Sequence, residues 1–113
     1  MAKTLFEKII DREIPAQFVY EDDQCVVIRD INPQAPLHLL VIPRKPMAML
    51  SAAEPADQAL LGHLMLVANK VAAEAGYKDA FRLVINNGAE ACQTVFHLHI
   101  HLIAGRPLGW PPG

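Results

Sequence analysis

Hydrophobic and polar residues alternate strictly in one stretch near the C-terminus, which reads FHLHIH over residues 96–101. A period of two is typical of a β-strand, in which successive side chains point to opposite faces of a sheet. We therefore predict a strand over residues 95–105, with its leucines and isoleucine packed under a long helix. The opposite face carries His97, His99 and His101. We expect that face to be a groove or an open surface, because a dry core could not supply partners for three adjacent imidazoles.

Two segments have the apolar spacing of a helix. Residues 4–14 predict a short helix that Pro15 ends, and residues 51–76 predict a long helix that Gly76 ends. Each begins with the residue pair of a capping box, Thr4 with Glu7 and Ser51 with Glu54.

The remaining apolar runs predict strands. Residues 17–31 form two runs around the polar turn 21–24, which indicates a β-hairpin. Residues 37–43 and 81–88 predict two further strands. Because short turns join most of these strands, we expect antiparallel pairing and an α+β fold.

The composition fits one globular domain. The chain has 113 residues, of which 52% are hydrophobic, which excludes a disordered protein. A net charge of −2 gives no basic field for nucleic acid. Its two cysteines, Cys25 and Cys92, fit a reducing compartment, with Cys25 as a small core residue. No apolar run approaches membrane-spanning length and no signal-peptide core is evident, so we expect a soluble cytoplasmic protein without membrane or nucleic-acid partners.

Three interpretations of the histidine strand compete. Solvated histidines on a polar sheet face are the plainest, but histidine is not a strong strand former, which disfavours three in strict alternation. A zinc site would need two of the three histidines together with His38, and the strand supplies no carboxylate or thiolate. The third interpretation is nucleophilic catalysis. A neutral imidazole is a good nucleophile near pH 7, and the middle histidine, His99, has a neighbour on each side to assist it.

The histidine stretch also carries a resemblance. The sequence HLHIHLI, residues 97–103, resembles the signature of the histidine triad (HIT) superfamily of nucleotide hydrolases and transferases. The segments DINPQAPLHLLVIPRK, LLGHLM, VINNG and GRPLGWPPG are similar to the Hint branch, the purine nucleoside phosphoramidases. The similarity extends from Phe6 to Gly113. It implies one HIT domain over residues 1–113 with a tail over 107–113, a five-stranded antiparallel sheet with one long and one short helix, and homodimers that pair their sheets edge to edge.

The resemblance implies a catalytic set of five residues. His99 matches the family's nucleophile, which attacks the α-phosphorus and forms a nucleotidyl-histidine intermediate. His97 and His101 match the flanking members of the triad, and His38 matches an additional active-site histidine. Thr94 stands where the family has a hydroxyl, usually serine, near the phosphate and the leaving amine.

The resemblance also implies substrate-binding residues. Asp30 matches the acid that hydrogen-bonds the ribose, and Asn86 matches an asparagine at the phosphate end. The apolar walls around the purine match Phe6, Ile9, Ile28 and Ile31. Two features depart from the family: Ala91 and Cys92 replace glycines in the loop near the phosphate, and Ile28 replaces an aromatic wall. His63 has no tie to the triad, and we interpret it as structural.

We therefore expect a hydrolase that cleaves the P–N bond of AMP or GMP amine adducts without a metal or other cofactor. Two alternatives stay open, a dinucleoside polyphosphate hydrolase of the same superfamily and a non-catalytic nucleotide-binding regulatory module. Trp110, the only tryptophan, is expected to border the leaving-group side of a pocket, in the other subunit of a homodimer. The alternative is that Trp110 packs against its own core.

Overall fold

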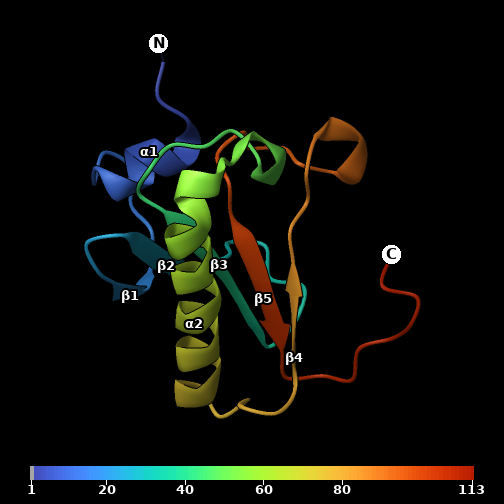
Figure 1. The fold of residues 1–113 in the computed structure, drawn as a ribbon. Coiled ribbons are helices and arrows are strands. Elements are labelled where there is room, and N and C mark those ends of the chain that lie inside the picture. Colours follow the sequence, from blue (N-terminus) through green and yellow to red (C-terminus); the bar gives the residue numbers. More distant parts are fainter. Residues whose placement is uncertain (1) are drawn as a thin grey trace.

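Five antiparallel strands form one sheet in the order β1-β2-β3-β5-β4 (Figure 1). The structure is a computed structural model that describes residues 2–113. The strands are β1 (Phe18–Glu21), β2 (Cys25–Arg29), β3 (Leu37–Pro43), β4 (Phe81–Val84) and β5 (Ile100–Ala104). Every neighbouring pair is antiparallel, which confirms the predicted α+β class and the number of strands.

The two faces of the sheet pack against different helices. The long helix α2 (Gln58–Glu74) covers one face, where Leu64 and Val71 meet Leu39 and Leu102 in the larger apolar cluster. The short helix α1 (Leu5–Ile10) lies on the other face, where its buried residues join a second cluster. Alternate residues of β2, β3 and β5 go to alternate faces, as a period of two requires. The predicted packing of the leucine face under the long helix is confirmed.

The boundaries of the helices differ from the prediction in two places. The Thr4 and Glu7 capping box is present, but α1 ends at Ile10, before Pro15 is reached, and Arg12 follows with a φ of 64°. The long helix begins at Gln58 rather than near Ser51. No helix among residues 2–113 is long and apolar enough to cross a membrane.

A proline accounts for the late start of α2. Two 3₁₀ turns, Leu50–Ala52 and Pro55–Asp57, precede the helix. Pro55 has no N–H to donate, so it favours the first turn of a helical segment and not its interior. The Asp57 carboxylate accepts the N–H of Glu54 at 2.9 Å, and the Ser51 N–H is taken by Asn87 Oδ1 at 2.8 Å. Gly76 follows the helix with a φ of 93°, in line with the predicted stop.

Strands β4 and β5 are shorter than predicted. After Val84 the chain leaves the sheet and forms a loop with a 3₁₀ turn at Ala89–Ala91. The segment before Ile100 therefore has no β4 residue beside it. Its Leu98 N–H donates instead to the carbonyl of Met47 at 2.7 Å. As a result, two of the three clustered histidines, His97 and His99, precede the regular strand.

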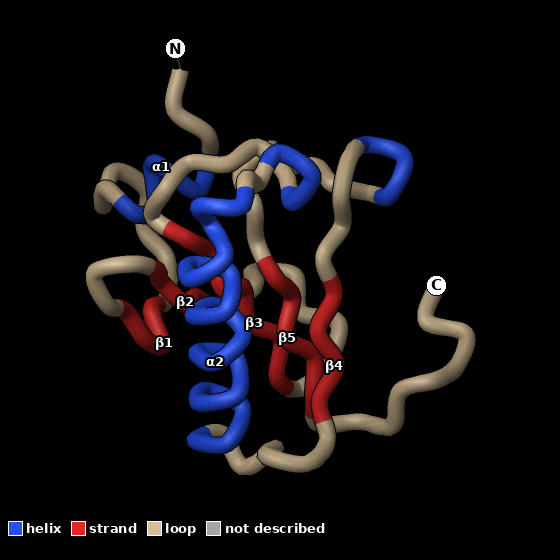
Figure 2. The backbone as a smooth tube through the Cα atoms, viewed as in Figure 1, coloured by secondary structure: helices blue, strands red, loops and turns tan. Residues whose placement is uncertain are grey.

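The tail leaves the sheet after β5 as an extended loop (Figure 2). Arg82 Nη2 donates to the Gly109 carbonyl at 2.7 Å, and Arg106 Nε donates to the Gln34 carbonyl at 3.0 Å. Trp110 is 83% exposed. The alternative in which Trp110 packs against its own core is therefore wrong.

Candidate active site

A cavity of about 320 Å³ opens on the α1 face of the sheet. Its wall brings together eight of the residues that the sequence predicted for the site: Phe6, Ile9, Ile28, Asp30, Ile31, Thr94, His99 and His101. No sequence pattern pointed to the other lining residues, which are Leu5, Ile14, Pro15, Ala16, Arg29, Leu40 and Val95. The cavity is therefore mainly apolar, with two imidazoles, one carboxylate and the side chain of Arg29 in its wall.

His99 has one ring nitrogen fixed and one free. Its Nδ1 lies 2.8 Å from the main-chain carbonyl of His97, which can only accept, so Nδ1 carries the proton and donates it. Nε2 is left with its lone pair. The ring is buried and packs edge-on against Phe6, with 4.8 Å between the ring centroids. Burial lowers the pKa of His99, which keeps the imidazole neutral and nucleophilic.

His38 and His101 form a hydrogen-bonded pair whose direction the main chain sets. The Gln34 N–H donates to His38 Nδ1 at 3.0 Å, so the proton of neutral His38 is on Nε2. That nitrogen lies 2.9 Å from His101 Nδ1 and donates to it. The proton of neutral His101 is then on Nε2, where it can be donated into the cavity. Burial, helped by His99 and His38, lowers the pKa of His101 to about 4, and burial also lowers the pKa of His38.

His97 does not share the cavity with the other two members of the triad. Its side chain is only 1% exposed, and it is absent from the lining. Nε2 donates to the Pro43 carbonyl at 2.8 Å, while Nδ1 lies 3.4 Å from the Thr4 hydroxyl. The expectation that all three imidazoles need an open groove is therefore wrong for His97, because the end of β3 supplies it with a main-chain acceptor, the Pro43 carbonyl. Its carbonyl in turn orients His99.

Asp30 follows β2 and brings a carboxylate to the histidine pair. Its Oδ1 accepts the Asn32 N–H at 2.8 Å, and its Oδ2 lies 3.4 Å from His38 Nε2. The ligand atoms of Asp30, His38 and His101 lie within 4.8 Å of one another, which would suit a metal ion. The sequence reasoning on zinc missed this carboxylate, because Asp30 follows β2 and is far from His101 in the chain.

Two of the predicted lining residues are exposed, and two other predicted residues lie outside the cavity. Thr94 is exposed at the wall of the cavity, and Ile31 is 98% exposed at its rim. Asn86 is half-buried outside the lining residues, and Trp110 lies in the tail. The roles of Asn86 and Trp110 in binding stay predictions.

One buried residue that the sequence reasoning missed holds the loop before the histidines. The Gln93 side chain accepts the Gly88 N–H at 2.8 Å. It also donates to the carbonyls of Ala48 and Val95, at 2.7 and 3.0 Å. A glutamine in a polar loop carries no sequence signal of burial, so only the structure could identify it. Its three bonds fix the segment that leads to Thr94 and the triad.

Comparison with known proteins gives one consistent result. The HIT domain matches residues 11–108. A HIT-like protein of Synechocystis sp. is 66% identical over 110 residues, which cover 97% of this chain and 96% of the relative. The 14 kDa zinc-binding protein of Zea mays is 48% identical over 112 residues, covering 97% and 88%. The crystal structure of a HIT family hydrolase from Legionella pneumophila matches with a TM-score of 0.96 and 43% identity, covering 98% of this chain and 100% of the other.

Proposed function

Because this chain belongs to the HIT domain family, we propose that it hydrolyses the P–N bond of purine nucleoside 5′-phosphoramidates. The observation that carries the proposal is the free Nε2 of His99 in a largely apolar cavity, beside a second histidine whose proton is available. A lone pair and a proton are the two things that displacement of an amine from phosphorus requires.

The proposed reaction has two steps in which the charges and protons balance. His99 Nε2 attacks phosphorus, a P–N bond to the imidazole forms, and the P–N bond to the amine breaks. The departing amine takes the Nε2 proton of His101, so the histidine pair is left one proton short, and its negative charge offsets the positive charge of the His99 imidazolium. Water then attacks phosphorus and breaks the bond to Nε2. One water proton returns to the histidine pair, and the nucleoside monophosphate leaves.

The walls of the cavity support a purine nucleotide as the substrate. Phe6, Ile9 and Ile28 present apolar surface against which a base can lie. Asp30 can accept hydrogen bonds from ribose hydroxyls through its Oδ2, since Oδ1 is already occupied by a main-chain N–H. Thr94 provides a hydroxyl near His99 for a phosphate oxygen or the amine. Apolar walls do not distinguish adenine from guanine, so both AMP and GMP adducts are included.

A homodimer is part of the proposal. The outer edge of β4 has no neighbouring strand among the described residues, so its main-chain groups can pair with a second sheet. Nearby, an apolar groove lined by Leu61, Met65 and Ile85 runs along α2. Leu66 on the same helix is 67% exposed. An open strand edge beside exposed apolar side chains is what an edge-to-edge dimer would cover.

Intact mass spectrometry after mixing with an adenosine phosphoramidate tests the proposal. We expect one nucleoside monophosphate on the parent protein and none on His99→Ala. Turnover should fall by roughly three orders of magnitude or more in this variant, because the covalent step is lost. AMP binding and the circular dichroism spectrum should be kept. Turnover within about tenfold of the parent would exclude His99 as the nucleophile. Faster cleavage of a diadenosine polyphosphate than of the phosphoramidate would favour the dinucleotide hydrolase instead.

A further inference from the structure

A second group of titratable side chains lies on the α2 face of the sheet, opposite the cavity. Asp22 is in the turn between β1 and β2, Cys25 is the first residue of β2, and His63 is on α2. Their ligand atoms all lie within 4.8 Å of one another. The proposed hydrolysis uses none of these three residues.

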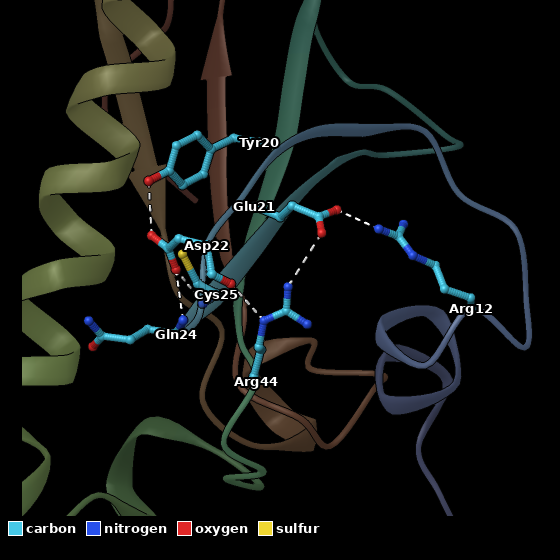
Figure 3. A network of polar contacts seen from close by, with 7 residues as sticks. All are labelled: Arg12, Tyr20, Glu21, Asp22, Gln24, Cys25 and Arg44. Atoms are coloured by element: carbon cyan, nitrogen blue, oxygen red, sulfur yellow. Dashed lines mark hydrogen bonds and ion pairs between the residues drawn. The ribbon is translucent and has the colours of Figure 1, made fainter.

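The hairpin turn fixes the Asp22 carboxylate. Its Oδ1 accepts the N–H groups of Gln24 and Cys25, both at 2.8 Å, which leaves Oδ2 for other partners. Oδ2 lies 2.7 Å from His63 Nε2 and 2.9 Å from the Tyr20 hydroxyl. Figure 3 shows the sulfur of Cys25 beside this carboxylate, with the Tyr20 hydroxyl directed at it. A carboxylate oxygen, a thiol and an imidazole nitrogen thus converge on one point.

This donor set suits zinc better than the other common metal ions. Zinc accepts imidazole nitrogen, thiolate sulfur and carboxylate oxygen in one tetrahedral shell, at about 2.0 Å to nitrogen and 2.3 Å to sulfur. Calcium and magnesium prefer oxygen alone. Cys25 is fully buried, whereas Asp22 and His63 are partly exposed, so an ion can enter from solvent. The open side leaves a fourth position for water or for the Tyr20 hydroxyl.

Before a metal binds, Asp22 supplies the negative charge of the cluster. Burial by itself would favour a protonated Asp22, but the N–H of Gln24 and the His63 imidazole hold its pKa well below the usual range. Burial raises the pKa of the Cys25 thiol to about 12, so the thiol is protonated until a metal replaces the proton. A hydrogen bond between Asp22 and His63 would by itself account for the closeness of these two side chains. It would not account for the Cys25 thiol beside them.

We propose that Asp22, Cys25 and His63 bind one zinc ion that joins the β1–β2 hairpin to α2. On binding, the Cys25 thiol releases its proton to solvent and becomes the thiolate ligand. The Asp22–His63 hydrogen bond breaks, the proton on His63 Nε2 moves to Nδ1, and Nε2 binds the metal. The thiolate and the carboxylate together neutralise the charge of the ion. Since a proton is released, the affinity rises with pH.

Cobalt(II) tests the site, because a cobalt–thiolate bond gives a charge-transfer band in the near ultraviolet. The full chain carrying Cys92→Ser is used, so that Cys25 is the only thiol. We expect one equivalent of cobalt to produce the band, zinc to abolish it by competition, and zinc to raise the melting temperature. His63→Gln and Asp22→Asn should each weaken cobalt binding by at least about tenfold. Asp23→Asn is the matched control, since Asp23 is exposed beside the cluster, and it should leave the band unchanged.

Three results would overturn the proposal. The first is the absence of the band at millimolar cobalt. The second is a band that His63→Gln leaves unchanged in a variant whose circular dichroism spectrum is that of the parent. The third is one equivalent of bound cobalt that gives no thiolate band and is lost in His101→Asn, which would assign the metal to the cavity on the other face. Each result can be read without a phosphoramidate, so failure of this proposal is distinct from failure of the proposed activity.

Discussion

The proton positions on the histidines follow from two main-chain groups. The His97 carbonyl can only accept, so His99 Nδ1 holds a proton and Nε2 is free. The Gln34 N–H can only donate, so His38 Nδ1 has no proton and the donor direction runs on to His101. A nucleophile and a proton donor therefore arise from the backbone, and no ionised side chain is needed to set either tautomer.

This arrangement predicts an unusual acid limit of activity. Burial lowers the pKa of His99, His38 and His101, so all three stay neutral below the ordinary histidine value of 6.5. We expect kcat/KM for a phosphoramidate to be level through pH 6.5 and to fall only at lower pH. The pH profile of kcat/KM measures this limit, and circular dichroism at each pH shows that the fold is kept. An acid limb centred at or above pH 6.5 would contradict the expectation.

The same pKa directions bear on stability. In the pH range below 6.5 the unfolded chain binds protons that the folded histidines do not. The free energy of unfolding should therefore decrease as the pH falls below 6.5 toward 4.

Another prediction at the residue scale concerns metal in the cavity. The Nε2 of His38 and the Nδ1 of His101, which a metal would use beside Asp30, are already joined to each other at 2.9 Å. We expect phosphoramidase activity to survive extensive treatment with EDTA, measured in protein that keeps its circular dichroism spectrum. If EDTA abolishes activity in folded protein and zinc restores it, the metal-free mechanism is wrong.

Side-chain alternation predicts part of this site and leaves part of it out. It places His101 on the face opposite Leu102. It also places His38 of the neighbouring strand on the same face as His101. It does not describe His97, because the regular strand begins only at Ile100, next to His101, which makes the last pair with β4 through Val84. The start of a strand depends on where its partner leaves, and that information lies in another part of the chain.

At the scale of elements, α1 connects the capping chemistry to the cavity. The Thr4 hydroxyl accepts the Glu7 N–H at 3.1 Å, and Glu7 Oε1 accepts the Thr4 N–H at 3.0 Å. The helix that this box starts supplies Phe6 and Ile9 to the cavity wall. The Thr4 hydroxyl also lies 3.4 Å from His97 Nδ1, so one side chain contacts both the helix start and the triad.

Replacing this hydroxyl should destabilise the protein. Thr4→Ala is expected to lower the free energy of unfolding by about 1 kcal/mol, because the Glu7 N–H loses its acceptor. Urea denaturation measures the change. Thr4→Ser retains the hydroxyl and is the matched control, with a loss of no more than a few tenths of a kcal/mol. Equal losses in the two variants would show that the threonine methyl, and not the cap, stabilises this end of the chain.

The two predicted capping boxes show the limit of a local signal. Thr4 with Glu7 starts α1, whereas Ser51 with Glu54 has the same spacing and starts no α-helix. Two residues make the difference. Pro55 follows Glu54 directly, and the side chain of Asn87, in a loop distant in sequence, accepts the Ser51 N–H. The first of these is visible in the sequence and the second is not. The strand β3 was predicted to the residue, because seven consecutive apolar or half-apolar positions end at a proline.

At the scale of the whole molecule, the cavity, the proposed metal site and the tail lie in three different places. The cavity lies on the α1 face, and the cluster around Cys25 lies on the α2 face. The tail lies at neither. Leu37 and Ala104 are partners at the end of the sheet from which the tail leaves, and Trp110 is absent from the cavity lining. An indole this exposed, held through the Arg82 contact to Gly109, has its apolar surface available to another molecule.

That exposure leads to a prediction about leaving groups. If the tail of one subunit borders the cavity of its partner, as the sequence predicts, Trp110 meets only amines large enough to reach it. Removing residues 107–113 should then lower kcat/KM more for a bulky amine adduct than for the ammonia adduct, since the lost contact forms only with the larger group. Steady-state kinetics on both substrates measures the ratio, and light scattering with circular dichroism shows whether the truncated chain stays dimeric and folded. Trp110→Ala should reproduce the selective loss without shortening the chain, which separates the indole from the rest of the tail. An equal loss on both substrates in a folded dimer would mean that the tail serves the structure and does not recognise the leaving group.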